Sequence, residues 1–383
     1  MTVSYNLDVS SVNSFTFLKL LGKWRGSIFK SVYLELIGWI IAYYIVHCVY
    51  RFCLPENGQR LFERIAGHLD NRLVYIPLTF MLGFFVTIVI DRWRNILSNM
   101  AFIEGVALVV NSYVRGAEEE PRLIRRSVIR YLVLSQVLVF RDISMRVRRR
   151  FPNMESLIDA GFILKNELEI MKNFQFDYNK YWIPINWATT LLNRCWFDEK
   201  EQLQRKYIDS APLLNQMNTE VRVFRDHLDM MSKYDWVPIP IAYPQVVFLA
   251  VRVYFVICLF SRQFMIEVDE SRNQMNLVFP LMTVLEFLFF VGWMKVAEAL
   301  LNPLGEDDDD LECNWLIDKN IASAAARHRS CVSSNRALTE CECVKQQRLG
   351  RMVVCQAGAA RDHNWTSKEP LLGILVMCQA TAP

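Results

Sequence analysis

The stretch Leu73–Ile90, LVYIPLTFMLGFFVTIVI, contains no charged residue and constrains the fold more than any other part of the chain. It is long enough to cross a bilayer as a helix, and Pro77 lies near its start, where a helix can begin or bend. Ile76, Phe80 and Phe84 recur at intervals of four, so a helix places all three on one face. Spacing alone favours ordinary packing between membrane helices. The alternative is the apolar wall of a pore, a constriction that gates by dewetting.

Composition indicates that much of the chain faces lipid. The 383 residues are 52% hydrophobic and carry a net charge of only +3, which gives no general argument for a nucleic-acid partner. The ten cysteines form no CxxC pair, and we expect most of them to be reduced. Met1–Thr16 lacks the basic start and apolar block of a secretory signal, so the first membrane helix is expected to direct insertion.

Four apolar stretches are predicted to span the membrane: Val32–Tyr50, Leu73–Ile90, Trp236–Phe260 and Leu277–Val296. Pro238, Pro240 and Pro244 make the start of the third stretch irregular, with an uninterrupted helix only after Gln245. The segment Arg51–Arg72 has mixed charge and is predicted to be a short connection outside the cell.

Four spans place both termini on one side of the membrane, and the basic residues before the first span and after the second place that side in the cytosol. The long block Asp91–Asp235 is then cytosolic. It is predicted to be helical, with periodic patterns at Asn99–Tyr113, Glu118–Phe140 and Leu203–Ser232. Two arginine clusters in this block are typical of solvated faces or headgroup contacts, with a role in concentrating anions as the alternative. They are Arg122, Arg125, Arg126 and Arg130, and Arg146, Arg148, Arg149 and Arg150.

These features predict six segments. They are a cytosolic N-terminal segment (1–31), the first and second spans (32–98), a cytosolic helical domain (99–235), the third and fourth spans (236–300), an acidic region (301–320) and a tail (321–383). The tail is rich in Ala, Ser and Cys and has no sustained periodicity, so we expect it to be mostly disordered.

The acidic run Glu306–Asp310, within NPLGEDDDDLE, is the densest chemical feature of the chain. It lacks the alternating ligands, central glycine and closing glutamate of an EF-hand, and a solvated acidic loop is the plainer interpretation. A calcium site is the alternative, because adjacent carboxylates repel and a hard dication relieves that repulsion. Asp307 and Asp310 can point the same way on one helical turn. Asn302 and Pro303 predict a sharp chain reversal just before them.

Enzyme signatures are absent from the sequence. It contains no HExxH, GxSxG, Walker A or GxGxxG motif, and we predict that the protein is not an enzyme. Nucleic-acid binding has only the arginine clusters in its favour, without a recognisable module, and is not expected.

Six segments stand out as a set: MTVSYN, WRGSIFK (Trp24–Lys30), IPLTFMLGFFVT followed by DRW, IRY (Ile129–Tyr131), YDWVPIPIAYPQVV (Tyr234–Val247) and FVGWMKVAEALLNPLGEDDDD (Phe290–Asp310). Together they resemble the bestrophins, a family of calcium-activated anion channels. The resemblance runs in one register from Met1 to about Asn320, and NPxGEDDDD is its most specific part. Beyond Asn320 the family continues with a segment that wraps adjacent subunits and helps control gating, whereas the tail here is different.

The resemblance implies an all-α membrane protein with four membrane-spanning segments and a helical cytosolic domain in each subunit. It implies a homopentamer around one axial pore, in contact with membrane lipids. Chloride and other small anions are the implied permeant species. The implied location is the plasma membrane, with several crossings and both termini in the cytosol.

The resemblance also implies the site residues. By position, the residues that match the hydrophobic neck, which gates the pore, are Ile76, Phe80 and Phe84. A second constriction falls, on a loose alignment, near Ile208. Calcium is the implied cofactor, bound by the carboxylates of Asp307 and Asp310 and by the backbone carbonyls of Ser10, Ala299 and Asn302.

Two functions from other classes remain open. One is a non-conducting membrane scaffold that regulates other channels through its cytosolic block, and the other is a carrier with alternating access. A carrier has less support, because the chain shows no internal repeat of the kind that transporters have. Current carried by the purified protein alone separates a channel from a scaffold.

Overall fold

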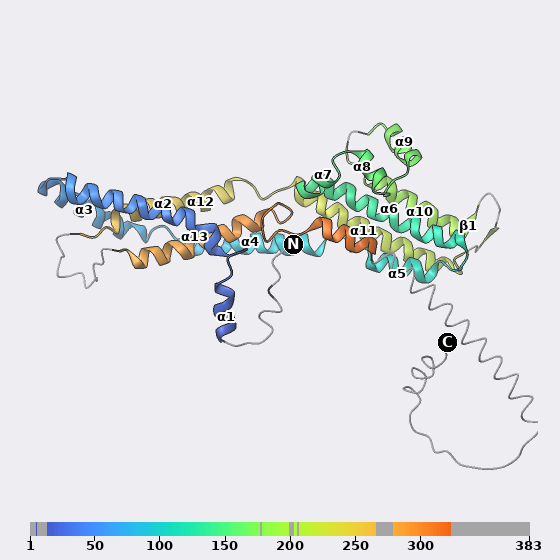
Figure 1. The fold of residues 1–383 in the computed structure, drawn as a ribbon, viewed down its shortest axis with the longest axis horizontal. Coiled ribbons are helices and arrows are strands. Elements are labelled where there is room, and N and C mark those ends of the chain that lie inside the picture. Colours follow the sequence, from blue (N-terminus) through green and yellow to red (C-terminus); the bar gives the residue numbers. More distant parts are fainter. Residues whose placement is uncertain are drawn as a thin grey trace, which may run out of the picture. The chain divides into compact units, whose positions relative to one another are not determined.

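The computed structural model describes Tyr5 and residues 14–176, 178–198, 203–204, 207–265 and 279–322. Helices make up most of this part of the chain (Figure 1). Its strands are the two-residue pair β1 (Phe197–Asp198) and β2 (Leu203–Gln204), which run antiparallel. The predicted all-α fold is therefore confirmed.

The helices begin with α1 (Ser14–Leu21), α2 (Ile28–Cys48), the π-helical turn η1 (Val49–Cys53), α3 (Glu56–Leu73) and α4 (Leu78–Ser98). The following helices are α5 (Glu104–Tyr113), α6 (Glu119–Ile143), α7 (Met145–Arg150), α8 (Met154–Asp159), α9 (Lys165–Asn173), α10 (Trp182–Trp196) and α11 (Ala211–Trp236). Last come α12 (Ala242–Ser261) and α13 (Leu281–Leu301). Residues 313–322 form a further helix.

Two helical stretches are long and apolar enough to cross a membrane, Ile28–Cys53 and Ala242–Ser261. The pair α3 and α4, bent by 45° at a short break, would add one broken span. The helix α13 has the length of a span, but it carries Glu286, Lys295 and Glu298. The four predicted spans thus correspond to α2, α4, α12 and α13, and two of them are clear from composition.

Within the apolar run Leu73–Ile90 the helix begins directly after Pro77, which is one of the two outcomes predicted at that proline. Helix α3 ends at Leu73 and α4 begins at Leu78. The break falls where Pro77 provides no backbone N–H and restricts the backbone of Ile76 before it. The connection expected at Arg51–Arg72 is wrong, because most of it forms α3.

The start of the third span agrees closely with the prediction. Backbone before α12 is irregular through Pro238 and Pro240, and the helix begins at Ala242. Pro244 lies in its first turn, where a missing N–H breaks no helical hydrogen bond. The helix therefore starts a few residues earlier than the predicted Gln245.

Two clusters of buried apolar side chains hold the helices together. One joins α2, α4, α12 and α13 and includes Val32, Leu82, Phe85, Val251 and Phe287. The other joins α5, α6, α10 and α11, together with the short helices α7 to α9, and continues into Leu304 and the helix that follows the acidic run. The acidic run thus lies between a helix of the first cluster and a helix of the second.

The periodic patterns predicted within Asp91–Asp235 agree with its long helices to different degrees. The pattern predicted at Glu118–Phe140 corresponds to α6, and the one at Asn99–Tyr113 begins later, at Glu104. The pattern predicted from Leu203 is wrong in its first part, since that part contains β2 and α11 starts at Ala211.

The expectation that the arginine clusters are solvated faces is also wrong in part. Arg125 is 5% exposed, and its Nη1 donates to the Val114 carbonyl at 2.7 Å. Arg130 binds both carboxylate oxygens of Glu167 at 2.7 Å. A buried cation is tolerated only with such partners. These two guanidinium groups therefore act as internal contacts that join α6 to neighbouring parts of the chain.

Candidate functional site: the exposed face of α4 and the acidic loop

Helix α4 has two different apolar faces. Leu82 and Phe85 are fully buried on the face that packs against α13 and α12. Phe80 and Phe84 lie on another face and are 66% and 57% exposed. Their rings touch edge to face, with centroids 4.6 Å apart, so one turn of α4 presents a continuous aromatic surface.

An apolar hollow of about 330 Å³ lies beside this surface. Its lining comes from α4 and the start of α12: Phe80, Met81, Phe84, Tyr243, Val246 and Val247. No charged side chain contributes to that lining. The hollow therefore suits apolar groups of a neighbouring chain, lipid or poorly hydrated solvent.

Ile76 does not share the face of Phe80 and Phe84. It lies in the break before α4, where its N–H donates to the Leu73 carbonyl at 3.1 Å. Its side chain is partly buried and packs against the apolar cluster that joins α2, α4, α12 and α13. The helical row of three expected from spacing is thus a pair, because Pro77 ends the helical register.

Ile208, the residue predicted near a second constriction, lies just before α11. Its side chain is 0% exposed and belongs to the apolar cluster that joins α5, α6, α10 and α11. In the part of the chain that the structure describes, Phe80 and Phe84 are exposed and Ile208 is buried.

The acidic loop begins where α13 ends. A helical carbonyl normally accepts from the N–H four residues later, but for Ala299 that residue is Pro303, which has no N–H. The chain then turns through 302–312: the Gly305 N–H donates to the Asn302 carbonyl at 3.3 Å, and the Leu311 N–H to the Pro303 carbonyl at 2.7 Å. The chain reversal predicted at Asn302 and Pro303 is confirmed.

The carboxylates of the loop have different surroundings. Glu306 pairs with Arg149 at 2.9 Å, and Asp308 pairs with Lys30 at 2.5 Å. The Lys30 ammonium holds the pKa of Asp308 below its ordinary value. Asp307 makes no ion pair with any residue that the structure describes.

Asp310 is enclosed by the loop itself. It is 3% exposed, and its Oδ2 accepts the Asp307 N–H at 2.6 Å. Burial raises the pKa of Asp310, and the neighbouring Asp307 carboxylate adds to the rise. Such a carboxylate gains most from a cation placed beside it.

The oxygen atoms of the loop fit a hard cation. A Cβ added to Gly305 would lie 2.9 Å from Asp310 Oδ2 and 3.3 Å from the Asn302 carbonyl oxygen, so these oxygens face a common point. No group of three or more His, Cys, Asp or Glu side chains in the described part of the chain could hold a metal ion. A cation here would therefore need carbonyl oxygens as well as Asp307 and Asp310, which is the donor mixture that calcium takes. The fifth predicted ligand, Ser10, lies outside the described residues.

The loop is also tied to the start of α2, which the sequence did not indicate. Arg25 Nε lies 3.6 Å from Asp308 Oδ1. Gly26 has φ +70°, and an added Cβ would lie 2.7 Å from Asp309 Oδ1. The basic residues before the first span were the available signal, but their partners lie far away in the sequence.

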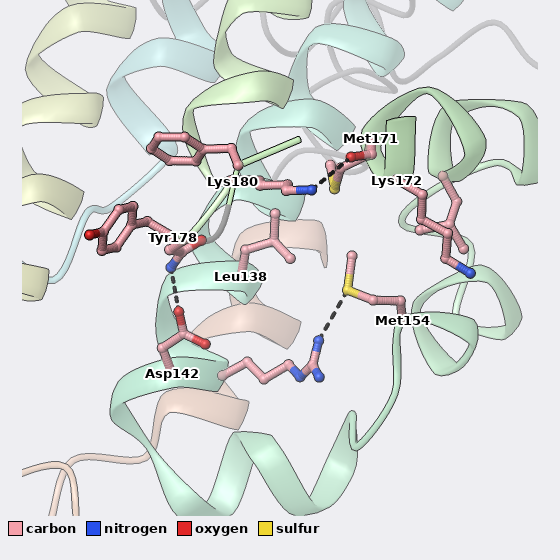
Figure 2. Close-up of a pocket in the computed structure, with 11 residues that line it drawn as sticks. Leu138, Asp142, Met154, Met171, Lys172, Tyr178 and Lys180 are labelled. Atoms are coloured by element: carbon pink, nitrogen blue, oxygen red, sulfur yellow. Dashed lines mark hydrogen bonds between the residues drawn. The ribbon is translucent and has the colours of Figure 1, made fainter. Parts of the chain in front are cut away.

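A further hollow, of about 380 Å³, lies between α6, α8 and α9 (Figure 2). Asn179 donates to Asp142 at 2.5 Å, and Arg141 donates to the Met154 sulfur at 3.0 Å. Dashed lines in Figure 2 end on the labelled Asp142 and Met154. None of the predicted site residues lines this hollow.

Three comparisons place the chain among known proteins. The sequence model described as "Bestrophin, RFP-TM, chloride channel" matches residues 1–327. Bestrophin homolog 17 of Caenorhabditis elegans is 53% identical over 327 residues, which cover 85% of this chain and 66% of that protein. Bestrophin homolog 22 of the same organism is 48% identical over 323 residues, covering 84% of this chain and 63% of that protein. The chain thus covers less than two thirds of the length of either relative.

Solved structures agree on the fold. A crystal structure of a bacterial bestrophin homolog from Klebsiella pneumoniae, solved by Zn-SAD phasing, matches with a TM-score of 0.57 at 15% identity. The match covers 78% of this chain and 98% of that one. A point mutant of the Klebsiella pneumoniae protein matches with the same TM-score of 0.57 at 16% identity, covering 76% and 97%. From the match over residues 1–327 and the identity to these relatives, the chain belongs to the bestrophin family.

Proposed function

We propose that this chain is the subunit of a plasma-membrane anion channel that conducts chloride and opens when calcium binds the acidic loop. Family membership supports the choice of a channel, since the family's sequence model is described as a chloride channel. The single observation that carries the proposal is the exposed pair Phe80 and Phe84 on a helix whose opposite face is buried.

The exposed face of α4 has the chemistry of a gate. Copies of α4 around a shared axis would bring their Phe80 and Phe84 rings into an apolar ring. A narrow apolar constriction excludes ions while it is dry and conducts when it widens enough to wet. The edges of phenylalanine rings carry partial positive charge, so they can meet an anion without trapping it.

The acidic loop has the oxygen donors for calcium. Bound calcium would supply the positive charge that relieves repulsion between the Asp307 and Asp310 carboxylates. The carbonyls of Ala299 and Asn302 lie at the C-terminal end of α13, the negative end of its helix dipole. Ser10 would complete the set, as the resemblance implies.

The position of the loop supports coupling between calcium and the gate. The loop continues directly from α13, and α13 packs along α4. Asp308 also connects the loop to Lys30 in the first turn of α2. Calcium biases the open state only if the loop binds calcium more tightly in that state.

A recording from the purified chain in a planar bilayer tests the proposal. Under a chloride gradient with equal cations, we expect the reversal potential to follow chloride, and a calcium chelator on the cytosolic side should close the channel. A reversal potential that follows sodium would remove anion selectivity. Chloride current that persists in the chelator would contradict calcium gating but leave anion conduction in place.

The same recording separates the channel from the scaffold. A non-conducting regulator of other channels predicts no current from the purified protein at any calcium concentration. Silent protein that is folded and oligomeric in the bilayer would favour the scaffold.

A further inference from the structure

Helix α7 carries three arginines that reach acidic residues near the C-terminal end of the described chain. Arg149 pairs with Glu306 at 2.9 Å, and Arg150 pairs with Asp318 at 2.8 Å. In each pair, one of the two side chains is more than half exposed to solvent, and such ion pairs add little stability. The third arginine, Arg146, is in a different situation.

Arg146 makes two kinds of contact with the acidic loop. Its Nη1 pairs with Glu312 at 2.8 Å, with the side chains only 23% and 22% exposed. Its Nη2 donates to the backbone carbonyl of Asp307 at 3.0 Å. The same carbonyl accepts the Asp310 N–H at 3.3 Å. One guanidinium therefore fixes the turn that joins the two predicted calcium carboxylates.

The backbone around Arg146 holds both arms of the loop. The Ser144 hydroxyl donates to the Leu304 carbonyl at 3.2 Å, before the acidic run. The Asn314 side chain donates to the Arg146 carbonyl at 3.4 Å, after the run. The start of α7 thus contacts the chain on both sides of the acidic run, in addition to the hydrogen bonds within the loop.

We propose that Arg146 is a positioning residue for calcium, and this inference rests on the proposed calcium function of the loop. Arg146 keeps the turn of Asp307–Asp310 in its binding shape before calcium arrives. Arg146 pairs with Glu312, and its hydrogen bond to the Asp307 carbonyl holds the turn. Residues that support ligands in this way commonly change metal affinity by about tenfold or more when they are replaced.

Calcium binding to a charge-balanced double variant tests the role. Arg146→Met with Glu312→Gln removes the guanidinium and its partner charge together, so the net charge near the loop is unchanged. We expect the calcium dissociation constant, measured by radioactive calcium binding to the purified full chain at neutral pH, to rise about tenfold.

The chain offers a matched control on the same helix. Arg150→Met with Asp318→Asn removes an ion pair on the same helix whose guanidinium binds Asp318 and not the loop carbonyls of the described chain. We expect its dissociation constant to stay within about twofold of the wild type. A third variant, Arg146→Lys, keeps the charge and one donor, and it should give an intermediate constant even if the double variant fails to fold.

The outcomes separate the inference from the proposed function. Wild-type protein that binds no calcium would overturn the calcium function itself. Wild-type protein that binds calcium while Arg146→Lys and the Arg146 double variant bind it equally well would overturn the positioning role alone. Equal weakening in both double variants would also overturn it, because a general loss of stability would then explain the change.

Discussion

Asp307 and Glu306 are neighbours in the acidic run, but the fold gives their carboxylates different tasks. Glu306 is paired with Arg149, whereas Asp307 faces no described cation. The sequence shows five adjacent acidic residues and cannot separate them, because Arg149 lies 157 positions from Glu306. Only the folded chain shows which carboxylates are already neutralised.

Replacing Asp307 by Asn should raise the calcium needed for half-maximal chloride current about tenfold, because loss of a carboxylate ligand costs of the order of 1.4 kcal/mol. Glu306→Gln is the matched control, since it removes the same charge from the same loop. If long-range attraction alone mattered, the two variants would shift the calcium response equally. Equal shifts would remove Asp307 from the ligand set.

Glu167 shows how a residue that looks like a surface charge becomes structural. It is 7% exposed and accepts hydrogen bonds from Arg130, from the Tyr131 hydroxyl at 2.8 Å and from the Leu164 N–H at 2.9 Å. Burial opposes ionisation of the carboxyl, but these donors outweigh it and lower the pKa of Glu167. Periodicity places Arg130 on a helix and says nothing of this partner.

Glu167→Gln should therefore destabilise the cytosolic helices by roughly 3 kcal/mol at neutral pH, since it leaves a partly buried Arg130 without its counter-charge. A lowered folded pKa gives stability that is present above the unfolded value of about 4.3 and is lost as pH falls through the folded value. Thermal unfolding of both proteins from pH 8 to pH 3.5 checks this. The gap in melting temperature should be constant above about pH 5 and narrow below 4.3; a gap that widens in acid would contradict the assignment.

At the scale of elements, the apolar run Leu73–Ile90 predicted a membrane helix, and α4 accounts for most of it. The position of the break could not be predicted from hydrophobicity, since both sides of Pro77 are equally apolar. A proline within an apolar run can begin a helix or bend one. The hydrophobicity of the run does not distinguish these two outcomes. The loss of Ile76 from the aromatic face follows from the start of the helix after Pro77.

Phe80→Ala combined with Phe84→Ala should leave chloride current that persists in calcium chelator, because removing the rings widens and wets the constriction. Phe289→Ala is the control, since Phe289 on α13 is 65% exposed, close to the 66% of Phe80. Bilayer recordings in chelator compare the two. A double variant that still closes completely would exclude this face of α4 as the gate.

The contact of α2 with α13 depends on a residue without a side chain. A Cβ on Gly292 would lie 2.3 Å from Cδ1 and 2.8 Å from Cγ1 of Ile28. Both distances are far below van der Waals contact, so α13 can approach α2 this closely only with glycine at this position. The sequence around Gly292 and Ile28 does not predict that these two residues are in contact.

Gly292→Ala should lower the thermal stability of the membrane helices, by about 1–3 kcal/mol for an overpacked contact. Adding Ile28→Ala should recover part of that loss, because it removes the clashing atoms. Gly38→Ala, at a glycine of α2 with nothing within 4 Å, is the control and should have little effect. If Ile28→Ala and Gly292→Ala simply add their losses, the two residues do not limit the helix approach.

At the scale of the whole molecule, the pattern of the sequence was enough to predict an all-α fold with long apolar helices and a chain reversal at Asn302 and Pro303. It could not predict which surfaces of a single chain stay uncovered. Phe80 and Phe84 are exposed, and so are Arg252 at 47% and Glu298 at 48%, within helices of the membrane cluster. Charged side chains in such helices are expected to face protein or water rather than lipid tails.

Copies of the chain would cover these surfaces together. Packing around an axis would place Phe80 and Phe84 at the centre, and contacts between adjacent copies would shield Arg252 and Glu298 from lipid. The resemblance to the family implies five copies, so native mass spectrometry from detergent should give five times the 44.9 kDa chain.

Phe84→Cys should then be slow to react with a water-soluble thiol reagent in chelator and faster in calcium, because wetting of the constriction exposes it. A monomer in lipid, with Phe84→Cys unreactive in both conditions, would mean that this face of α4 meets lipid and that the chain has no axial gate.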